Sequence, residues 1–576
     1  MFKSKRMPYA CMVFLSLLFV VAQSLMGQTA ATGALSGTVT DPSGAVIANA
    51  MVTIVSIETG QTRTVMTGMD GSYKAGLLPP GTYRIKFEVA GFQSVEVPSI
   101  TVHVTETPVL NQVMSVGAQS QQVEVQGEAV EEVQTSNATV GTLVSGKTIA
   151  DFPLTSRNYT NILGLSAGSN TGVNNAAALG KGTQNIAVNG SSTTQNNFQM
   201  DGVSMNDPSS NGTASESGYN AGVGIANPDA IEEFKIQTSL VDAGYGRKPG
   251  ANVNVVTKSG TNAFHGTLFE FFRNTALNAN DFFRNQSYIG TTPNNSRQVL
   301  NQNQFGGVIG GPIKKDKFFF FASYQESRQK NGVATQGSSA PTLLPIPTGD
   351  RSNTATFRAA LGAVFCPTVA QGGTCPSASG GKTSNGGQQV LPDGSNINQV
   401  AINLLQLKTP DGSYYIPSSG TAGNLPTTLT IPATYSEHQA LGNLDYVINS
   451  KNTLSWKWFF GEDPTQAPFG CTATVALGTP PGICLPYTAG ATNYENQSAL
   501  LKLTSIVSSS MVNEARISIQ HNKGQVTNQV PFTNSQVGVA SILPSIGALD
   551  QFNVSGLFSI GTTTSVGGSY KHSSGF

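Results

Sequence analysis

Alternating apolar and polar residues predict several long strands in the second half of the chain. In residues 453–460, one face would carry Leu454, Trp456, Trp458 and Phe460, and the other Thr453, Ser455, Lys457 and Phe459. The same period of two recurs in residues 317–329 and 515–520. Because neighbouring side chains of a strand point to opposite faces, each segment has one apolar and one more polar face. Soluble sandwiches and membrane barrels both contain such strands.

The lengths of the connections favour the membrane barrel. Residues 311–316 and 449–452 are tight turns, whereas the connections over 330–433 and 461–492 are long. Short turns at one end and long loops at the other are typical of outer-membrane barrels, and a loop of about 100 residues is unusual in a compact soluble domain. We therefore predict that residues 263–576 form antiparallel transmembrane strands in contact with outer-membrane lipid.

Two further features refine this barrel prediction. Trp456, Trp458 and Phe460 share the apolar face and are candidates for the aromatic girdle at a membrane–water interface. Only about seven strands can be placed between residues 264 and 521, whereas plugged outer-membrane transporters have about 22. Since barrel diameter grows with strand number, the pattern predicts the N-terminal part of a larger barrel, in a truncated chain.

Short strands separated by turns predict a small β-sandwich over residues 33–116. The clearest strand covers residues 82–89, where apolar Tyr83, Ile85, Phe87 and Val89 alternate with Arg84, Lys86 and Glu88. Pro79-Pro80-Gly81 lies before it and Gly91 after it, as expected for turns. Several such strands within about 80 residues are typical of a sandwich.

The first residues are typical of a secretory signal peptide. Lys3, Lys5 and Arg6 precede an apolar run at residues 10–22, and small residues follow it. The run has about 13 residues, which is too short to span a membrane comfortably. We therefore assign residues 1–28 to a signal peptide, and no other stretch of the sequence reaches about 18 consecutive apolar residues.

Charge and composition exclude one class of function. The 576 residues include 32 Lys and Arg and 32 Asp and Glu, so the net charge is zero, and charged residues make up 11%. Without a basic excess, nucleic-acid binding is not expected. A barrel strand exposes half its residues to lipid, and Asn, Gln, Ser, Thr and Gly can serve its inner face and loops, which accounts for the low charge.

Besides Cys11 of the signal peptide, the chain has four cysteines, which lie in the long loops. They form two pairs that are close in sequence: Cys366 with Cys375, and Cys471 with Cys484. In an oxidising compartment, we expect two loop-closing disulfides, Cys366–Cys375 and Cys471–Cys484. A zinc site is the alternative, but no histidine or carboxylate cluster accompanies either pair. We predict no metal site and no cofactor.

A polar and slightly acidic linker at residues 117–135 follows the predicted sandwich. It contains one patch that could form a strand, Val123, Glu124 and Val125. An extended segment of this kind can add to the sheet edge of another protein.

Residues 136–262 mix short strands, a helix and Gly/Asn loops, which predicts a small α/β domain. We expect a helix at residues 156–163 and an N-cap with a turn at Asn227. Gly164-Leu165-Ser166-Ala167-Gly168 also fits the nucleophile elbow of serine hydrolases. That elbow needs a strand before it and a helix after it, whereas here the predicted helix comes first. We therefore assign no catalytic residue.

The front segment resembles a known domain family. The strings SGTVTDPSGAVIANAMVT (36–53), DGSY (70–73) and PPGTYRIKFEVAGF (79–92) are similar to carboxypeptidase regulatory-like domains. The resemblance implies a transthyretin-like sandwich of the carbohydrate-binding-like type. It implies no catalytic or metal site, and a spacer or docking module is the simplest role.

The middle segment resembles the plug domain of TonB-dependent outer-membrane receptors. The strings that carry this resemblance are DFPLTSRNYTNILGLSAG (151–168), NNFQMDGVSMND (196–207) and NPDAIEEFKIQTSLVDAGYGRKPGANVNVVTKSGTN (227–262). NQFGGVIGGPIKKDKFFFFASYQ (303–325) is similar to the early barrel hairpin of the same family. Asn189-Gly190 replaces the Arg-Gly of many siderophore receptors, and Ser239-Leu240-Val241 replaces a Gly-Pro turn. With the front domain, these departures indicate the Oar-like branch of the family.

The resemblance implies energised uptake of a ligand through a plugged barrel. A TonB-type energy-transducing protein would pair with the TonB box, for which Val123, Glu124 and Val125 are the candidates by position. No bond of the ligand is broken, so no enzyme activity is expected. The barrel would lie in the outer membrane of a Gram-negative cell, with the front domain in the periplasm.

Two other functions remain open at this point. One is an outer-membrane protein of the same family that assists adhesion or secretion, and the other is a secreted carbohydrate-binding β-protein. The extracellular ligand cannot be identified from the residues, although neutral loops suit an oligosaccharide or a peptide.

Overall fold

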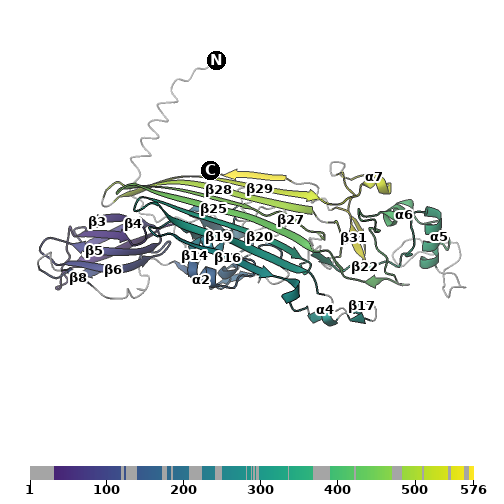
Figure 1. The fold of residues 1–576 in the computed structure, drawn as a ribbon, viewed down its shortest axis with the longest axis horizontal. Helices are drawn as coiled ribbons and strands as arrows, with labels where there is room; N and C mark the ends of the chain where they lie inside the picture. Colours follow the sequence, from purple (N-terminus) through teal and green to yellow (C-terminus); the bar gives the residue numbers. More distant parts are fainter. Residues whose placement is uncertain are drawn as a thin grey trace, which may run out of the picture.

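The computed structural model of the chain consists mainly of β-strands, which confirms the predicted fold class (Figure 1). It comprises a front domain, a middle domain, and a long curved sheet whose loops fold together at one end. The structure describes residues 31–117, 122–124, 139–171, 178–182, 186–206, 224–239, 249–280, 282–286, 288–289, 292–293, 297–334, 337–366, 390–420, 423–469, 483–488, 490–508, 511–542, 547–562 and 570–575. The predicted signal peptide, residues 1–28, lies outside these residues.

The front domain (residues 31–117 and 122–124) is a sandwich of two sheets. The smaller sheet has the strand order β4-β1-β7, and the larger has the order β3-β2-β5-β6-β8. Its strands are β1 (Gly33–Thr40), β2 (Met51–Ser56), β3 (Thr62–Met66), β4 (Ser72–Leu78), β5 (Gly81–Glu88), β6 (Ser94–Val102), β7 (Gln112–Val113) and β8 (Gln122–Glu124).

The core of the front domain follows from the alternation in its strands. In β5, Tyr83, Ile85 and Phe87 are buried while Arg84 is exposed, as the sequence pattern predicted. Phe87 meets Tyr73 of the opposite sheet edge-on, with ring centroids 5.8 Å apart. Aromatic pairs in this arrangement add stability beyond the burial of their area.

The middle domain (residues 139–257) is built on a five-stranded sheet with the order β13-β12-β15-β14-β9. All pairings in this sheet are antiparallel except that of β12 with β15. Its strands are β9 (Val140–Ser145), β10 (Ser169–Thr171), β11 (Ile186–Val188), β12 (Asn197–Met200), β13 (Val203–Ser204), β14 (Ile231–Ser239) and β15 (Asn252–Thr257). Its helices are α2 (Gly146–Asp151), α3 (Thr160–Leu163), η1 (Thr193–Gln195) and η2 (Pro228–Ala230).

The helix predicted at residues 156–163 is shorter than expected and covers only α3. Arg157 has a φ of 48°, in the left-handed region, so a right-handed helix cannot pass through it. The side chain of Asn158 instead accepts a hydrogen bond from the backbone N–H of Thr160, at 3.0 Å, where the helix begins. The N-cap predicted at Asn227 is present, since its side chain accepts from the N–H of Asp229.

The curved sheet runs antiparallel in the order β16-β19-β20-β25-β26-β28-β29-β32, with short β27 between β25 and β28 (Figure 1). Its strands are β16 (His265–Arg273), β19 (Leu300–Lys314), β20 (Phe318–Asn331), β25 (Ala433–Asn449), β26 (Asn452–Glu462), β27 (Thr465–Gln466), β28 (Gly490–Ile506), β29 (Val512–Asn528) and β32 (Tyr570–Gly575). The connection from β16 to β19 contains η3 (Thr275–Leu277), α4 (Phe282–Gln286), β17 (Tyr288–Ile289) and β18 (Thr292–Pro293).

One face of the curved sheet packs against the middle domain. Val308, Phe321, Leu441 and Phe459 of the sheet belong to the same buried cluster as Phe198 and Phe234 of the middle domain. The opposite face exposes apolar side chains, among them Ile309, Tyr324, Trp456, Leu501 and Ile517. Among the described residues, no helix is both long enough and apolar enough to span a membrane.

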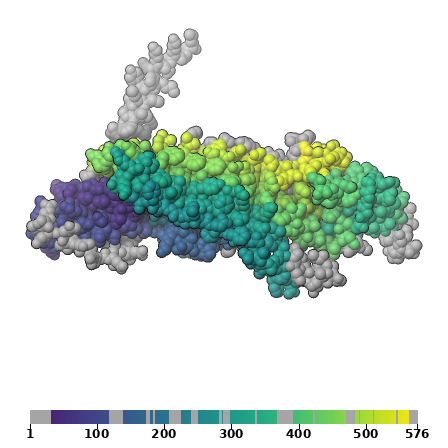
Figure 2. All heavy atoms as spheres, viewed as in Figure 1, coloured from purple at the N-terminus to yellow at the C-terminus, as the bar shows by residue number. Residues whose placement is uncertain are grey.

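The front domain lies at the end of the curved sheet where the tight turns are found (Figures 1 and 2). The N–H of Asn262 donates to the backbone carbonyl of Glu58 at 2.9 Å. Gln61 donates to the hydroxyl of Thr453, next to the turn between β25 and β26, at 2.7 Å. The turns and the long loops are therefore at opposite ends of the sheet, as the sequence predicted.

The long loops fold together into a unit that we call the loop cap (residues 337–366, 390–432, 483–488 and 529–562). Its elements are β21 (Ser338–Ser339), β22 (Thr342–Leu343), α5 (Thr354–Phe365), α6 (Gln399–Gln406), β23 (Leu425–Pro426), β24 (Leu429–Thr430), α7 (Asn534–Val537), β30 (Phe552–Val554) and β31 (Phe558–Ile560). Phe357, Tyr415, Leu485 and Phe532, which come from three different loops, share one buried core. Tyr415 and Phe532 have ring centroids 4.7 Å apart.

Candidate functional site

Polar side chains join the middle domain to the curved sheet, and Arg157 is the most highly connected of them. Its side chain is buried, and it donates through Nε to Gln325 Oε1 at 2.9 Å. Nη2 donates to Asn227 Oδ1 at 2.8 Å and forms an ion pair with Asp229. The guanidinium group also lies 4.2 Å from the ring centroid of Phe269. The left-handed backbone at Arg157 therefore places one cation against both parts of the molecule.

Asn227 extends this network to a second residue of β20 and to the next strand, β25. Its backbone N–H donates to Gln439 Oε1, and its side-chain amide lies 3.3 Å from Ser323 Oγ. Gln439 in turn donates to the backbone carbonyl of Ile225. The turn at Asn227 is thus bound to β20 and β25 through side chains of the sheet.

A second group of contacts holds residues 178–182 against the sheet near the loop cap. Gln329 accepts from the N–H of Gly180 at 2.7 Å and donates to the carbonyl of Ala178 at 3.1 Å. Lys181 lies 3.0 Å from a carboxylate oxygen of Glu437 and 3.7 Å from one of Asp463. A cation between two acids with little exposure is an ion pair whose rupture would leave buried charge.

A third group lies nearer the tight turns. Lys457 Nζ is 2.6 Å from Asp201 Oδ1, and the other oxygen of Asp201 accepts from Thr257 Oγ1 at 2.7 Å. Asn443 donates to the same threonine hydroxyl at 2.9 Å. These contacts bind the end of the central strand β15 and the turn between β12 and β13 to β25 and β26.

This interface is suited to being broken and reformed. Each hydrogen bond contributes only about 0.5–1.5 kcal/mol net, because water can take the place of either partner. A middle domain held by many such bonds is stable at rest, yet it can be displaced if water enters or if a force is applied. The apolar cluster that the two parts also share, with Phe198 and Phe459 among its members, has no such replacement partners on separation.

Apart from the N-cap at Asn227, the sequence did not single out the residues of this interface. Arg157, Lys181 and Asp201 lie in loops or turns, where no periodic pattern marks them. Lys457 was assigned to the more polar face of its strand, but its partner 256 residues away could not be deduced. Only the alternation of β26 was a usable signal.

The girdle candidates lie on the face of the sheet that points away from the middle domain. Trp456 is 39% exposed, whereas Phe459 of the same strand, which points to the opposite face, is buried against the middle domain. Trp458 and Phe460 stack, with ring centroids 6.2 Å apart and planes 16° apart. The three residues therefore have the outward orientation that a lipid-facing role needs, and that role stays a prediction.

Two of the four cysteine candidates lie in the loop cap. Cys366 and Cys484 are each disulfide-bonded. Cys375 and Cys471 lie outside the described residues, so the two predicted pairings stay predictions. Among the described residues, no cluster of three or more His, Cys, Asp or Glu side chains could hold a metal ion.

The TonB-box candidates lie beside the front domain. Val123 and Glu124 belong to β8, which pairs in parallel with β6. Val125 lies outside the described residues. Val123 and Glu124 are thus paired within this chain, whereas the sequence had suggested an exposed segment available to another protein.

The Gly164–Gly168 motif does not have the surroundings of a nucleophile elbow. Helix α3 precedes it, and Ser166 is buried at 6% exposure. A nucleophile elbow requires a strand before the serine and an exposed hydroxyl.

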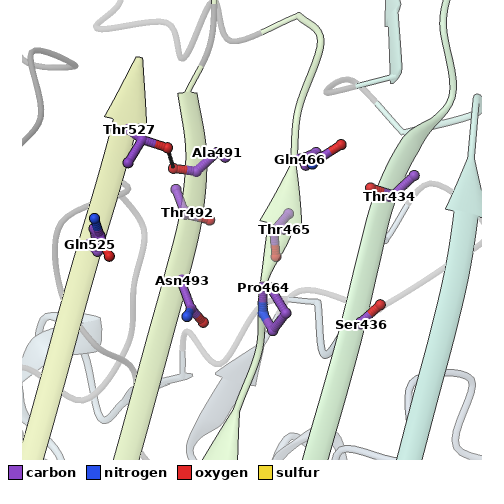
Figure 3. A pocket seen from close by; sticks show the side chains of 10 residues that line it. All are labelled: Thr434, Ser436, Pro464, Thr465, Gln466, Ala491, Thr492, Asn493, Gln525 and Thr527. Atoms are coloured by element: carbon purple, nitrogen blue, oxygen red, sulfur yellow. Dashed lines mark hydrogen bonds between the residues drawn. The ribbon is translucent and has the colours of Figure 1, made fainter. Parts of the chain in front are cut away.

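A small polar hollow of about 280 Å³ opens on the outer side of the curved sheet near the loop cap (Figure 3). Side chains from β25, β27, β28 and β29 line it, including Ser436, Thr465, Asn493 and Gln525. A hydrogen bond of 3.3 Å from Thr527 to the carbonyl of Ala491 crosses one side of it. It contains no charged side chain and no catalytic grouping.

Comparisons with known protein families match two parts of the chain. Residues 256–575 match the family described as outer membrane beta barrel domain, and residues 34–115 match the carboxypeptidase regulatory-like domain. The TonB-dependent transporter Oar of Myxococcus xanthus is 30% identical over 321 residues. That match covers 54% of this chain and 28% of the relative, so the chain spans less than a third of its length.

Two solved structures share partial similarity with the chain. The outer membrane transporter YddB of Escherichia coli has a TM-score of 0.41 at 10% identity, covering 74% of this chain and 43% of its own. The siderophore receptor PirA of Acinetobacter baumannii has a TM-score of 0.31 at 12% identity, covering 67% of this chain and 45% of its own.

Proposed function

Because the chain belongs to the outer-membrane β-barrel family, we propose that it works as an Oar-like TonB-dependent transporter. Membership in the family locates the strands of the curved sheet in an outer membrane. In the proposed function, the middle domain is the plug, and a ligand bound at the loop-cap end passes when the plug is displaced. Oligosaccharides and peptides are the ligand classes that we favour, since the loops carry few charges.

The observation that carries this proposal is the contact between the middle domain and the sheet. A buried core shared by both parts, with Phe198 and Phe459 among its members, fixes the position of the middle domain. Around that core, the interface consists of hydrogen bonds and ion pairs centred on Arg157, Lys181 and Lys457. A plug must block the barrel at rest and move under load, and this mixture of contacts meets both requirements.

Energy would come from a TonB-type protein that binds the linker between the front and middle domains. Pairing with an extended segment by strand addition is a common mode of peptide recognition. The linker precedes β9, so a force on it reaches the edge strand of the middle-domain sheet first. The front domain lies at the tight-turn end, and we propose that this end faces the periplasm.

The loop cap favours a second candidate, an outer-membrane protein of the same family that assists adhesion or secretion. Its three loops share one hydrophobic core and therefore present a folded surface. Such a surface could bind a large partner at the cell exterior without importing it.

The test uses the natural gene product in energised cells. We expect it in the outer-membrane fraction, with faster gel migration before boiling than after. Accumulation of labelled oligosaccharide or peptide should stop when the proton-motive force is collapsed, while surface binding persists. Val125→Pro should have the same effect, whereas the matched Val125→Ile should not. Uptake that survives both collapse and Val125→Pro would contradict the transporter proposal, and binding without any uptake would favour adhesion.

A further inference from the structure

The front domain contacts the middle domain through charged side chains that are almost fully buried on the middle-domain side. His103 Nδ1 lies 2.8 Å from Glu233 of β14, and the N–H of Val104 donates to the same carboxylate. Lys235, two residues further along β14, lies 2.8 Å from Glu106. The side chains of Glu233 and Lys235 are 6% and 4% exposed. Since hydrogen bonds that include a charged group are roughly twice as strong as neutral ones, this contact is a strong one.

A small apolar cluster strengthens the same contact. Val104 of the front domain and Val256 of β15 share one buried cluster with Ala31, and Leu143 of β9 packs against it. Strands β15, β14 and β9 are neighbours in the middle-domain sheet. The front domain is therefore bound to three adjacent strands of this sheet, through ion pairs on the middle one and apolar side chains on the other two.

Neutral hydrogen bonds connect the front domain to the tight-turn end of the curved sheet. Asn262, which lies between β15 and β16, donates its N–H to the carbonyl of Glu58, and Gln61 donates to the hydroxyl of Thr453. The side chain of Asn262 in turn exchanges two hydrogen bonds with Asp316, in the turn between β19 and β20, at 2.7 and 2.8 Å. The front domain therefore bridges the middle domain and the turns of the sheet.

We propose that the front domain and the middle domain move as one unit, and that the contacts at the tight turns open when the middle domain is displaced. This inference rests on the proposed function, because it takes the middle domain to be a plug that moves. Since water can replace either partner of a neutral hydrogen bond, the contacts at the turns open at little cost. Separation of the two domains would instead expose the apolar cluster and leave charged groups without their partners. The front domain would thus restrain the plug at rest rather than act as a spacer.

Two backbone amides report on the two contacts separately, because the N–H of Val104 donates to Glu233 and the N–H of Asn262 donates to Glu58. Hydrogen–deuterium exchange of both amides is measured in the natural gene product at rising urea concentration, without any transport assay. We expect Asn262 to lose protection at a lower urea concentration, and Val104 to lose it only together with β14 and β15. Loss of protection at Val104 first, or at both amides together while β14 stays protected, would overturn the proposal.

A charge-removing substitution tests whether the ion pairs hold the two domains together. Glu106→Gln keeps the shape of the side chain but removes the charge next to Lys235, and it should speed exchange at Val104 about tenfold. The matched control is Glu96→Gln, because Glu96 pairs at 3.3 Å with Arg84, whose side chain is 55% exposed. An exposed pair contributes little, so the control should change exchange at Val104 by less than about twofold. Equal effects of the two substitutions would contradict the role of the ion pairs.

Cross-linking tests the proposal during transport of the labelled oligosaccharide or peptide in energised cells. Gln61→Cys with Thr453→Cys, joined by a short reducible thiol cross-linker, should abolish uptake but not surface binding, and reduction should restore uptake. The matched pair, Glu106→Cys with Lys235→Cys, joins the front domain to the middle domain and should leave uptake unchanged, as should the cross-linker on the parent chain. Uptake that survives the first cross-link, or is lost with the second, would overturn the proposal. If the parent chain binds without uptake, the transporter function fails, and the exchange measurement still decides whether the two domains move together.

Discussion

Single residues decide how the front domain is attached, and His103 is the clearest case. Its imidazole faces Glu233 and Glu106, with Lys235 also nearby. The hydrogen bond to Glu233 is the main reason that the pKa of His103 is raised above its usual value, although burial opposes the shift. The protonated form therefore stabilises the docked arrangement.

This attachment should depend on pH. A raised folded-state pKa gives a stabilisation that is fully present below the unfolded-state pKa of about 6.5 and is lost as pH rises through the raised value. We expect His103→Gln to have a lower melting temperature than the parent chain at pH 6 and the same melting temperature at pH 9. Melting curves at both pH values check this expectation. A difference in melting temperature that grows with pH would contradict it.

Arg157 is the corresponding residue at the contact between the middle domain and the sheet. Lysine keeps the charge but cannot reach Gln325, Asn227 and Asp229 together, because it lacks the planar fork of donors. We expect Arg157→Lys to destabilise the middle domain by about 1–3 kcal/mol.

Hydrogen–deuterium exchange of residues 224–239 measures this effect. The matched control is Arg328→Lys, since the side chain of Arg328 is 67% exposed and its ion pair among the described residues is with Glu326. Lysine can keep an ion pair with one carboxylate, and a cation at the surface contributes about 0–1 kcal/mol, so the control should exchange like the parent chain. Equal exchange in both variants would mean that Arg157 does not hold the middle domain.

At the scale of elements, the loop cap has a buried hydrophobic cluster separate from that of the middle domain. Tyr415 is 2% exposed and contacts Phe532 from a different loop. Removing a buried aromatic ring costs about 3–5 kcal/mol. We expect Tyr415→Ala to make the loops sensitive to external protease while the curved sheet stays resistant.

The control for this substitution is Ile542→Ala, because Ile542 is 79% exposed on the same cap. Proteolysis of intact cells followed by mapping of the cleavage sites reports the result. Cleavage in the sheet, or equal cleavage in both variants, would show that the cap has no independent core.

The cap should also contain both predicted disulfides. Peptide mapping without reductant is expected to recover Cys366–Cys375 and Cys471–Cys484, and both linked peptides should vanish on reduction. Cys366 and Cys484 are already disulfide-bonded in the structure, so the open question is which cysteine each one pairs with. A cross-loop pair in place of the two local pairs would refute the pairing.

At the scale of the whole molecule, the curved sheet has two edge strands, β16 and β32. A membrane barrel has no free edge, because unpaired backbone groups are costly in lipid. Among the described residues the curved sheet is therefore open, and closing it into a barrel requires both of these edges to be paired.

Local patterns in the sequence determined the strands, the tight turns and the two faces of the curved sheet. Alternation with a period of two is visible within a few residues, so β5 and β26 could be predicted from their own side chains. Turn residues and loop lengths likewise indicated which end of the sheet carries the loops. The motifs at residues 151–168, 196–207 and 227–262 were enough to indicate the family of outer-membrane receptors.

Only the tertiary structure decided which distant residues meet. Arg157 contacts Gln325 across 168 positions and Lys457 contacts Asp201 across 256, and no local period encodes such pairs. The common core of the loop cap and the pairing of β8 with β6 have the same cause, because each depends on how separate elements pack. The physical reason is that hydrophobic burial and strand pairing require complementary surfaces, which exist only after the chain has folded.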